Sequence, residues 1–299
     1  MQISTAGFYN RAAARMADLS STTERLQTEI ATKKVNIASD DATGWTRLGG
    51  IKRDDAADGA YKANITLARG LLSQTDTALE QVSDRLVRVR ELAISANSGT
   101  LSMDGRAGIA TELEAIRDDM LSVANSKDVR GQPIFGGTGD AAFTKGTGGA
   151  IGYAGTGDVA TLPIGEGAQV QVGADGGRVF GGAADATDIF ATIATLVATL
   201  RDPAAALPAA AGKALDDLTK VESQVTTARA SAGARAARLE VESARLDTVA
   251  LDRTEARVAI EATDLPSAMV ELQKTMTVLQ ATQASVAKLA GMSLFDYLK

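Results

Sequence analysis

The side chains best placed for chemistry in this chain are the adjacent carboxylates of Asp40 and Asp41. Paired carboxylates serve as metal ligands or as a general acid and base. Neighbouring residues of a helix point in different directions, however, and no further acidic residues follow at the spacing of a calcium loop. A hydroxyl and negative charge are favoured at a helix N-terminus, so we interpret Ser39, Asp40 and Asp41 as a helix start.

Composition excludes several other kinds of site. The 299 residues include no Cys and no His, which excludes thiol nucleophiles, disulfides, histidine bases and zinc sites with sulfur or imidazole ligands. The glycine-rich run at 136–139 lacks the G-x-x-x-x-G-K-[ST] pattern of a phosphate-binding loop and predicts turns instead. We therefore expect no catalytic residues, no cofactor and no metal, and a protein that is not an enzyme.

The elements that would position any site are helices with a narrow apolar stripe. Apolar side chains recur at alternating steps of three and four residues in both terminal segments, a spacing typical of a coiled-coil seam. We expect the two ends to pair with each other or with neighbouring copies. The candidate assembly residues are Met16, Leu19, Leu26 and Ile30 at the N-terminal end and Leu265, Met269, Leu272, Met276, Leu279 and Val286 at the C-terminal end.

Aromatic residues are scarce, but four of them lie near the two ends of the chain. Phe295 and Tyr297 follow the end of the C-terminal stripe, so helix pairing alone does not account for them. Large aromatic side chains are frequent anchors of protein contacts. We predict that Phe295 and Tyr297 belong to the assembly surface, with packing against Phe8 and Tyr9 of the same chain as the alternative.

Further heptad patterns lie inside the terminal ones, at residues 65–96, 109–123 and 218–260. In the last of these, Arg235, Glu242 and Arg253 occupy positions where apolar side chains are expected. Either the stripe turns toward solvent there, or these residues form a polar layer that fixes the register between helices. The sequence leaves both interpretations open.

The middle of the chain differs in kind, because 17 of the 29 glycines lie between residues 131 and 182. Residues 159–164 and 168–172 alternate apolar and polar side chains, as half-buried strands do. Helix is expected again from about Asp188, with a loop at 203–212, and Asp264 and Pro266 mark the start of the last helix.

The expected fold is mainly α, a nested bundle of long coiled-coil helices from both termini with a small β-rich insertion. We predict a terminal-helix assembly domain at 1–40 and 264–299, a long-helix middle domain at 41–135 and 186–263, and the outer insertion at 136–185.

Charge and hydropathy exclude other classes of partner. The formal charge is −6 with no basic run, so we expect no nucleic-acid partner. The longest apolar run, 189–200, is shorter than the roughly 20 residues of a membrane helix, and we expect no membrane partner. The start of the chain has the pattern of an amphipathic helix rather than a cleaved secretory signal.

Several sequence runs resemble the bacterial flagellins. The matching N-terminal runs are Leu26-Gln-Thr-Glu-Ile30, Ile37-Ala-Ser-Asp-Asp-Ala-Thr-Gly44, Val87-Arg-Val-Arg-Glu-Leu-Ala93 and Gly131-Gln-Pro-Ile-Phe-Gly-Gly-Thr138. The C-terminal run Leu289-Ala-Gly-Met-Ser-Leu-Phe-Asp-Tyr-Leu298 is similar to the ending of the hook–filament junction branch of that family, the third hook-associated proteins. The resemblance covers both helical arms and is weak across the insertion.

The resemblance implies a structural protein of the flagellum. Its copies would form a ring that joins the first hook-associated protein, on the hook side, to flagellin beyond. Export would pass through the flagellar type III channel without cleavage, with a chaperone on the C-terminal helix, and would leave the protein in the extracellular flagellum.

One departure keeps a second function open. Junction proteins usually have Pro after the paired aspartates, whereas Ala42 follows Asp41 here, as in flagellins. Filament flagellin, major or minor, is therefore the alternative. A flagellin-like surface adhesin would need an aromatic platform in the insertion, and the sequence disfavours it because only Phe143, Tyr153 and Phe180 are available there.

Overall fold

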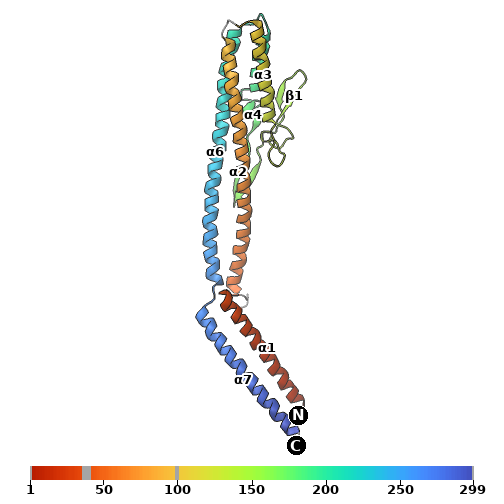
Figure 1. Ribbon diagram of the computed structural model, residues 1–299, viewed down its shortest axis with the longest axis vertical. Helices are drawn as coiled ribbons and strands as arrows, with labels where there is room; N and C mark the ends of the chain where they lie inside the picture. The colour runs from red at the N-terminus through yellow and green to blue at the C-terminus, as the bar shows by residue number, and fades with distance from the viewer. Residues whose placement is uncertain (1, 36–41, 98–100, 298–299) are drawn as a thin grey trace. The chain divides into compact units, whose positions relative to one another are not determined.

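The computed structural model describes residues 2–35, 42–97 and 101–297, and the side chains of 7–35, 42–97 and 101–288. Within these ranges the chain is mainly helical, as predicted, with two small antiparallel strand pairs (Figure 1). The elements in chain order are α1 (Gln2–Thr32), α2 (Ala42–Asn97), α3 (Met103–Ala124), β1 (Phe143–Lys145), β2 (Ile151–Tyr153), β3 (Thr161–Gly165), β4 (Ala168–Gln171), α4 (Gly176–Phe180), α5 (Ile189–Arg201), α6 (Leu207–Glu261) and α7 (Leu265–Tyr297).

The chain divides into two compact units. The terminal unit comprises Met1–Ala56 and Thr248–Lys299, and the central unit comprises Ala57–Asp247. The division falls inside the long helices α2 and α6, so each of these helices contributes to both units. The division into three domains at 1–40 with 264–299, 41–135 with 186–263, and 136–185 stays a prediction.

In the terminal unit, α1 and α7 lie side by side and run in opposite directions (Figure 1). Backbone contacts join the chain segments beside them, with Val35 N–H donating to the Glu261 carbonyl at 2.9 Å and Thr263 N–H donating to the Lys33 carbonyl at 3.2 Å. The Lys34 ammonium lies 2.9 Å from the Glu261 carboxylate. These contacts hold the C-terminal end of α1 next to the start of α7.

The central unit is built on the buried stripes of α2 and α6. The heptad residues predicted within 79–96 of α2 and 218–225 of α6 are buried and share one core with α3 and α5; they include Leu79, Val82, Leu86, Leu218 and Val221. Arg90 donates two hydrogen bonds to Glu222, at 2.8 and 2.7 Å, on the rim of this core. Such partly exposed ion pairs contribute little to stability, so burial of the stripes is the main source of stability.

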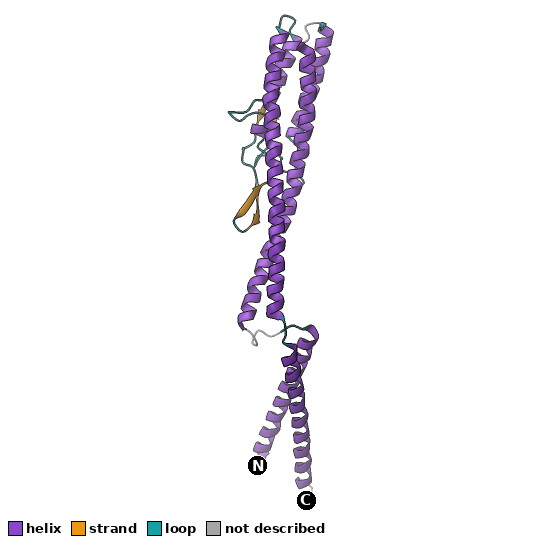
Figure 2. Cartoon of the chain, turned by 90° about the vertical axis from the view of Figure 1, so that its left-hand side faces the viewer, coloured by secondary structure: helices purple, strands orange, loops and turns teal. Residues whose placement is uncertain are grey.

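The insertion packs on the helices and has no separate core. Ile164, Val170 and Val172 share a second buried cluster with Ile65 of α2 and Leu239 of α6. The β3–β4 pair thus covers a stretch of the two long helices, and Figure 2 shows it beside them. The predicted strands at 159–164 and 168–172 correspond to β3 and β4.

Helix ends follow the predicted chemistry, with one correction. Asp188 caps α5 by accepting a hydrogen bond from Ala191 N–H at 2.9 Å. The expected loop at 203–212 is shorter, because α6 begins at Leu207 and contains Gly212. Pro208 is the second residue of α6, in the first turn, where a missing N–H costs no helical hydrogen bond. Ser39, Asp40 and Asp41 lie outside the described residues, and α2 begins directly after them at Ala42.

The burial pattern predicts how the isolated monomer exchanges its amide hydrogens. Among the described side chains, the buried apolar residues of the terminal unit are Leu26, Leu48 and Ala268, and all others lie in the central unit. Packing, not intrinsic propensity, stabilises most helices. We expect fast exchange in residues 1–38 and 266–299 and protection in 60–125 and 215–260, measured by mass spectrometry on a verified monomer. Slow exchange throughout both termini would contradict this.

Candidate assembly surfaces

The stripe on α1 faces α7 of the same chain, and its role in assembly stays a prediction. Leu26 is buried, with 4% of its surface exposed, and Met16, Leu19 and Ile30 are half-buried. Thr23, between them, is also buried and donates its hydroxyl to the Leu19 carbonyl at 2.8 Å. The polar group in this seam therefore carries its own hydrogen bond and costs little to bury.

On α7 the candidate residues divide into two stripes. Leu265, Leu272, Leu279 and Val286 are half-buried and alternate with Ala268, Thr275 and Thr282, which are buried or half-buried. This stripe has regular three–four spacing and is the face that packs on α1. Met269 and Met276 lie one position further along and are 59% and 39% exposed. The predicted α7 seam therefore mixes an inner stripe with an outward one, and its role in assembly stays a prediction.

The outward apolar residues are concentrated in the terminal unit. Eight of the thirteen large apolar side chains that are exposed among the described residues lie there: Phe8, Trp45, Leu251, Val258, Met269, Val270, Met276 and Val278. The unit also has no net charge, because its sequence holds 13 basic and 13 acidic residues, and the whole formal charge of −6 belongs to the central unit. A neutral surface with many apolar side chains is suited to association.

The predicted anchor role of the aromatic residues near the C-terminus concerns side chains that the structure does not describe. Helix α7 continues to Tyr297 in its backbone, but the side chains of Phe295 and Tyr297 lie outside the described residues. Phe8 and Tyr9 form an edge-to-face pair with ring centroids 5.9 Å apart. The anchor role of Phe295 and Tyr297 stays a prediction.

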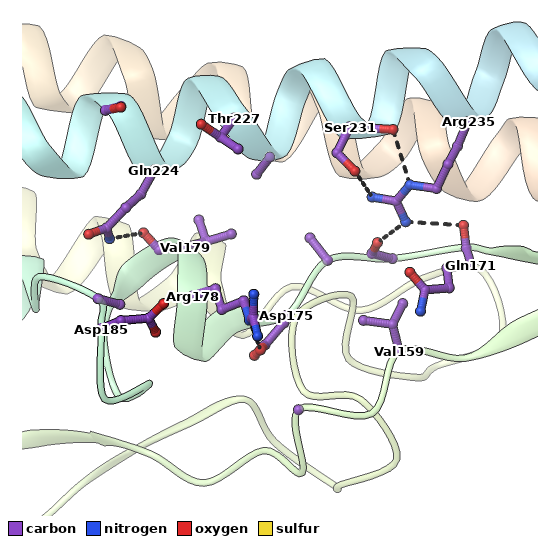
Figure 3. A pocket seen from close by; sticks show the side chains of 16 residues that line it. Val159, Gln171, Asp175, Arg178, Val179, Asp185, Gln224, Thr227, Ser231 and Arg235 are labelled. Carbon is purple, nitrogen blue, oxygen red and sulfur yellow. Dashed lines mark hydrogen bonds and ion pairs between the residues drawn. The ribbon is translucent and has the colours of Figure 1, made fainter.

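A second candidate surface is a groove of about 640 Å³ between the insertion and α6 (Figure 3). Arg235 projects from α6 and donates hydrogen bonds from Nη1 to the carbonyls of Gly173 and Gln171, at 2.7 and 3.1 Å. Its Nε–H donates to the Ser231 carbonyl at 3.1 Å. Burial lowers the pKa of this guanidinium, yet arginine stays charged at neutral pH. The charged guanidinium therefore binds backbone carbonyls of the insertion.

Gln224 makes a similar connection at the other end of the groove. Its side-chain amide donates to the carbonyls of Val179 and Thr187, both at 3.2 Å, and its oxygen accepts from Thr187 N–H at 2.7 Å. Arg235 and Gln224 together attach the insertion to α6 through its main chain. The heptad pattern left two interpretations of Arg235 open, a stripe that turns toward solvent or a polar layer between helices. The structure shows neither, because the Arg235 side chain binds the insertion.

The aromatic residues of the insertion are used internally. Phe143 and Phe180 are 3% and 0% exposed and pack edge to face with ring centroids 5.6 Å apart. The Tyr153 hydroxyl donates to Asp175 at 3.1 Å and accepts from Gly157 N–H at 3.1 Å. Burial, and then the charge of Asp175, raise the pKa of Tyr153. These rings pack into the core shared with the helices, so they do not form the exposed platform that a glycan-binding adhesin would need.

Two further observations concern the class of site. Among the described side chains, no group of three or more acidic residues is placed to hold a metal ion. Within the same ranges, no helix combines the length and the hydropathy needed to cross a membrane.

Known proteins are similar to this chain in sequence and in fold. Residues 3–140 match the family described as the bacterial flagellin N-terminal helical region. Flagellar hook-associated protein 3 of Escherichia coli K12 is 27% identical, covering 89% of this chain and 90% of that protein. Its counterpart in Salmonella typhimurium is 26% identical over 99% of each. A solved structure of a protein described as flagellar hook-associated, from Vibrio parahaemolyticus, is 25% identical with a TM-score of 0.69, covering 74% of this chain and 99% of that one.

Replacement of Arg235 tests the attachment of the insertion. Arg235→Met removes the donors to Gln171 and Gly173, and we expect a loss of about 1–3 kcal/mol in the free energy of unfolding of the β3–β4 region. Amide exchange of residues 168–172 should accelerate while exchange in α3 and α5 stays unchanged. Arg238→Met, at an exposed position of the same helix, is the control. Equal exchange in both variants would show that Arg235 does not hold the insertion.

Proposed function

We propose that this chain, which is similar to the bacterial flagellin N-terminal helical region and to flagellar hook-associated protein 3, forms part of the hook–filament junction of the bacterial flagellum. The observation that carries this proposal is the match to hook-associated protein 3 along almost the whole chain, both helical arms included. Copies of the chain would form a ring that joins the first hook-associated protein to flagellin. The protein would be extracellular, exported without cleavage.

The terminal unit supports this role physically. Its α1–α7 pair buries one stripe of each helix and leaves Met269, Val270 and Met276 in water. A pair of helices with a second apolar stripe is incomplete as a monomer and gains stability when neighbours cover that stripe. The same outward face of α7 offers an export chaperone a binding surface before assembly.

Filament flagellin is the second candidate, and Ala42 is the observation that favours it. Ala42 is the first residue of α2. Proline is favoured at a first helical position because its missing N–H costs nothing there. The Pro that is usual in junction proteins and the Ala found here therefore fit the same helix start. This substitution does not outweigh the whole-length match to hook-associated protein 3.

Deletion of the gene distinguishes the two candidates. A junction protein is required for filament attachment, so we expect the deletion strain to keep its hooks, to lose its filaments and to shed flagellin into the medium. Electron microscopy of cells and immunoblots of the culture supernatant measure these outcomes, with restoration by the plasmid-borne gene as the control. Filaments that remain attached with altered composition would indicate a minor flagellin.

Charge substitutions on α7 separate pairing within the chain from contact between chains. Met276→Asp adds a charge to the outward stripe, and an unpaired charge buried on assembly costs several kcal/mol. We expect attached filaments to fall at least about tenfold in the complemented deletion strain. The monomer should keep its circular dichroism spectrum and unfolding transition.

Two matched variants complete this test. Leu272→Asp places the charge on the inner stripe and should also weaken the α1–α7 pair, so both assembly and helix content should fall. Gln273→Asp adds the same charge at an exposed polar position of the same helix and should leave filament attachment near the wild-type level. Wild-type filament numbers with Met276→Asp would contradict a role for the outward stripe.

A further inference from the structure

Trp45 is the only tryptophan of the chain, and it lies on α2 with 45% of its surface exposed. Gly44 and Leu48, which flank it on the helix, are buried, so Trp45 lies outside the packed face of α2. Tryptophan is strongly enriched among the side chains that anchor protein contacts, because it buries a large area with few rotatable bonds. An exposed tryptophan in the terminal unit is therefore a candidate anchor for a partner surface.

A groove of suitable size lies elsewhere in the same unit, between α1 and α7. It has a volume of about 490 Å³, and its lining includes Phe8, Val278 and Val286. Phe8 is 41% exposed and Val278 is also 41% exposed, so apolar surface of the groove is open to solvent. The groove can take a large apolar side chain.

The groove also carries charge of the kind that attracts an indole ring. Arg11 and Arg15 line it and lie one helical turn apart on α1. Within the part of the chain that the structure describes, neither guanidinium has a carboxylate partner. A guanidinium over an aromatic face is favourable, and tryptophan is the best acceptor. The groove thus combines apolar walls with two cations that can stack on an indole.

Trp45 cannot fill the groove of its own chain. Arg15 lies 17 residues before Thr32 at the end of α1, which corresponds to roughly 25 Å of helix. The start of α2 is held at that far end, since Val35 N–H bonds to the Glu261 carbonyl at 2.9 Å and Asp55 pairs with Arg253 of α6 at 3.7 Å. The tryptophan lies near the C-terminal end of α1, far along that helix from the groove.

We propose that Trp45 of one copy of this chain inserts into the groove between α1 and α7 of a second copy, beneath Arg11 and Arg15. Each copy carries one tryptophan and one groove at different places, so the contact is head to tail and propagates into a ring or helix. The balanced charge of the terminal unit permits close approach of identical copies. This inference rests on the proposed function, because it requires copies that assemble.

Engineered cysteines test the contact, and the absence of native cysteine keeps the background clean. Thr46 is exposed beside Trp45, and Ser285 is exposed in the lining of the groove. The variants Thr46→Cys and Ser285→Cys would be co-expressed in the deletion strain, and intact flagella oxidised with a copper catalyst. We expect a disulfide-linked dimer that contains one copy of each variant. The double variant should give a ladder of linked copies.

Further substitutions identify the groups responsible. Trp45→Ala, or Arg11→Gln together with Arg15→Gln, should lower the cross-linked fraction at least several-fold, whereas Trp45→Phe should keep most of it. The control pair is Val258→Cys with Ser285→Cys, because Val258 is 58% exposed in the same unit but is not assigned to the contact. It should cross-link weakly.

The outcomes separate this inference from the proposed function. Attached filaments without a 46–285 cross-link would overturn the tryptophan contact and leave the junction role intact. A cross-link from residue 285 to a different flagellar protein would also overturn it, because the groove would then have another occupant. A deletion strain that keeps normal filaments would contradict the junction role itself.

Discussion

Two helices packed side by side bury one stripe each and leave their other surfaces in water. The α1–α7 pair of the terminal unit is subject to this constraint. Its inner stripe uses Leu272 and Leu279 with the smaller Ala268 and Thr275, while Met269 and Met276 remain outside. The central unit escapes the constraint because α3, α5 and the insertion cover the stripes of α2 and α6. The two units therefore differ in how much of their apolar surface a single copy can bury.

The sequence indicated the α1 stripe and the α2 and α6 stripes because most of the large apolar residues of these helices fall in one phase. On α7 it was ambiguous. Met269 and Met276 look like seam residues by hydropathy, whereas Ala268 and Thr275 do not, yet the smaller pair faces α1. Close approach of two helices favours small side chains at the contact, and a hydropathy pattern ranks residues by apolar size. Where a helix has large and small side chains in neighbouring stripes, only the position of the partner helix shows which stripe is in contact.

The insertion shows a different limit. Alternation predicted its strands, and Asp188 predicted the helix that follows, because both signals are local. The contact of Arg235 with Gln171 and Gly173 joins positions more than 60 residues apart. The only local sign was an arginine at a heptad position, which indicated a polar contact but not the residues that make it. The aromatic residues of the insertion likewise did not indicate whether they are buried or exposed, because a buried cluster and an exposed platform have the same composition.

Arg235 holds the insertion by main-chain carbonyl groups, and every amino acid supplies that group. Substitutions in the adjoining strand that preserve its backbone path leave this attachment intact, whatever side chains they introduce. This part of the attachment, shared with Gln224, therefore does not depend on which side chains the insertion presents at its surface.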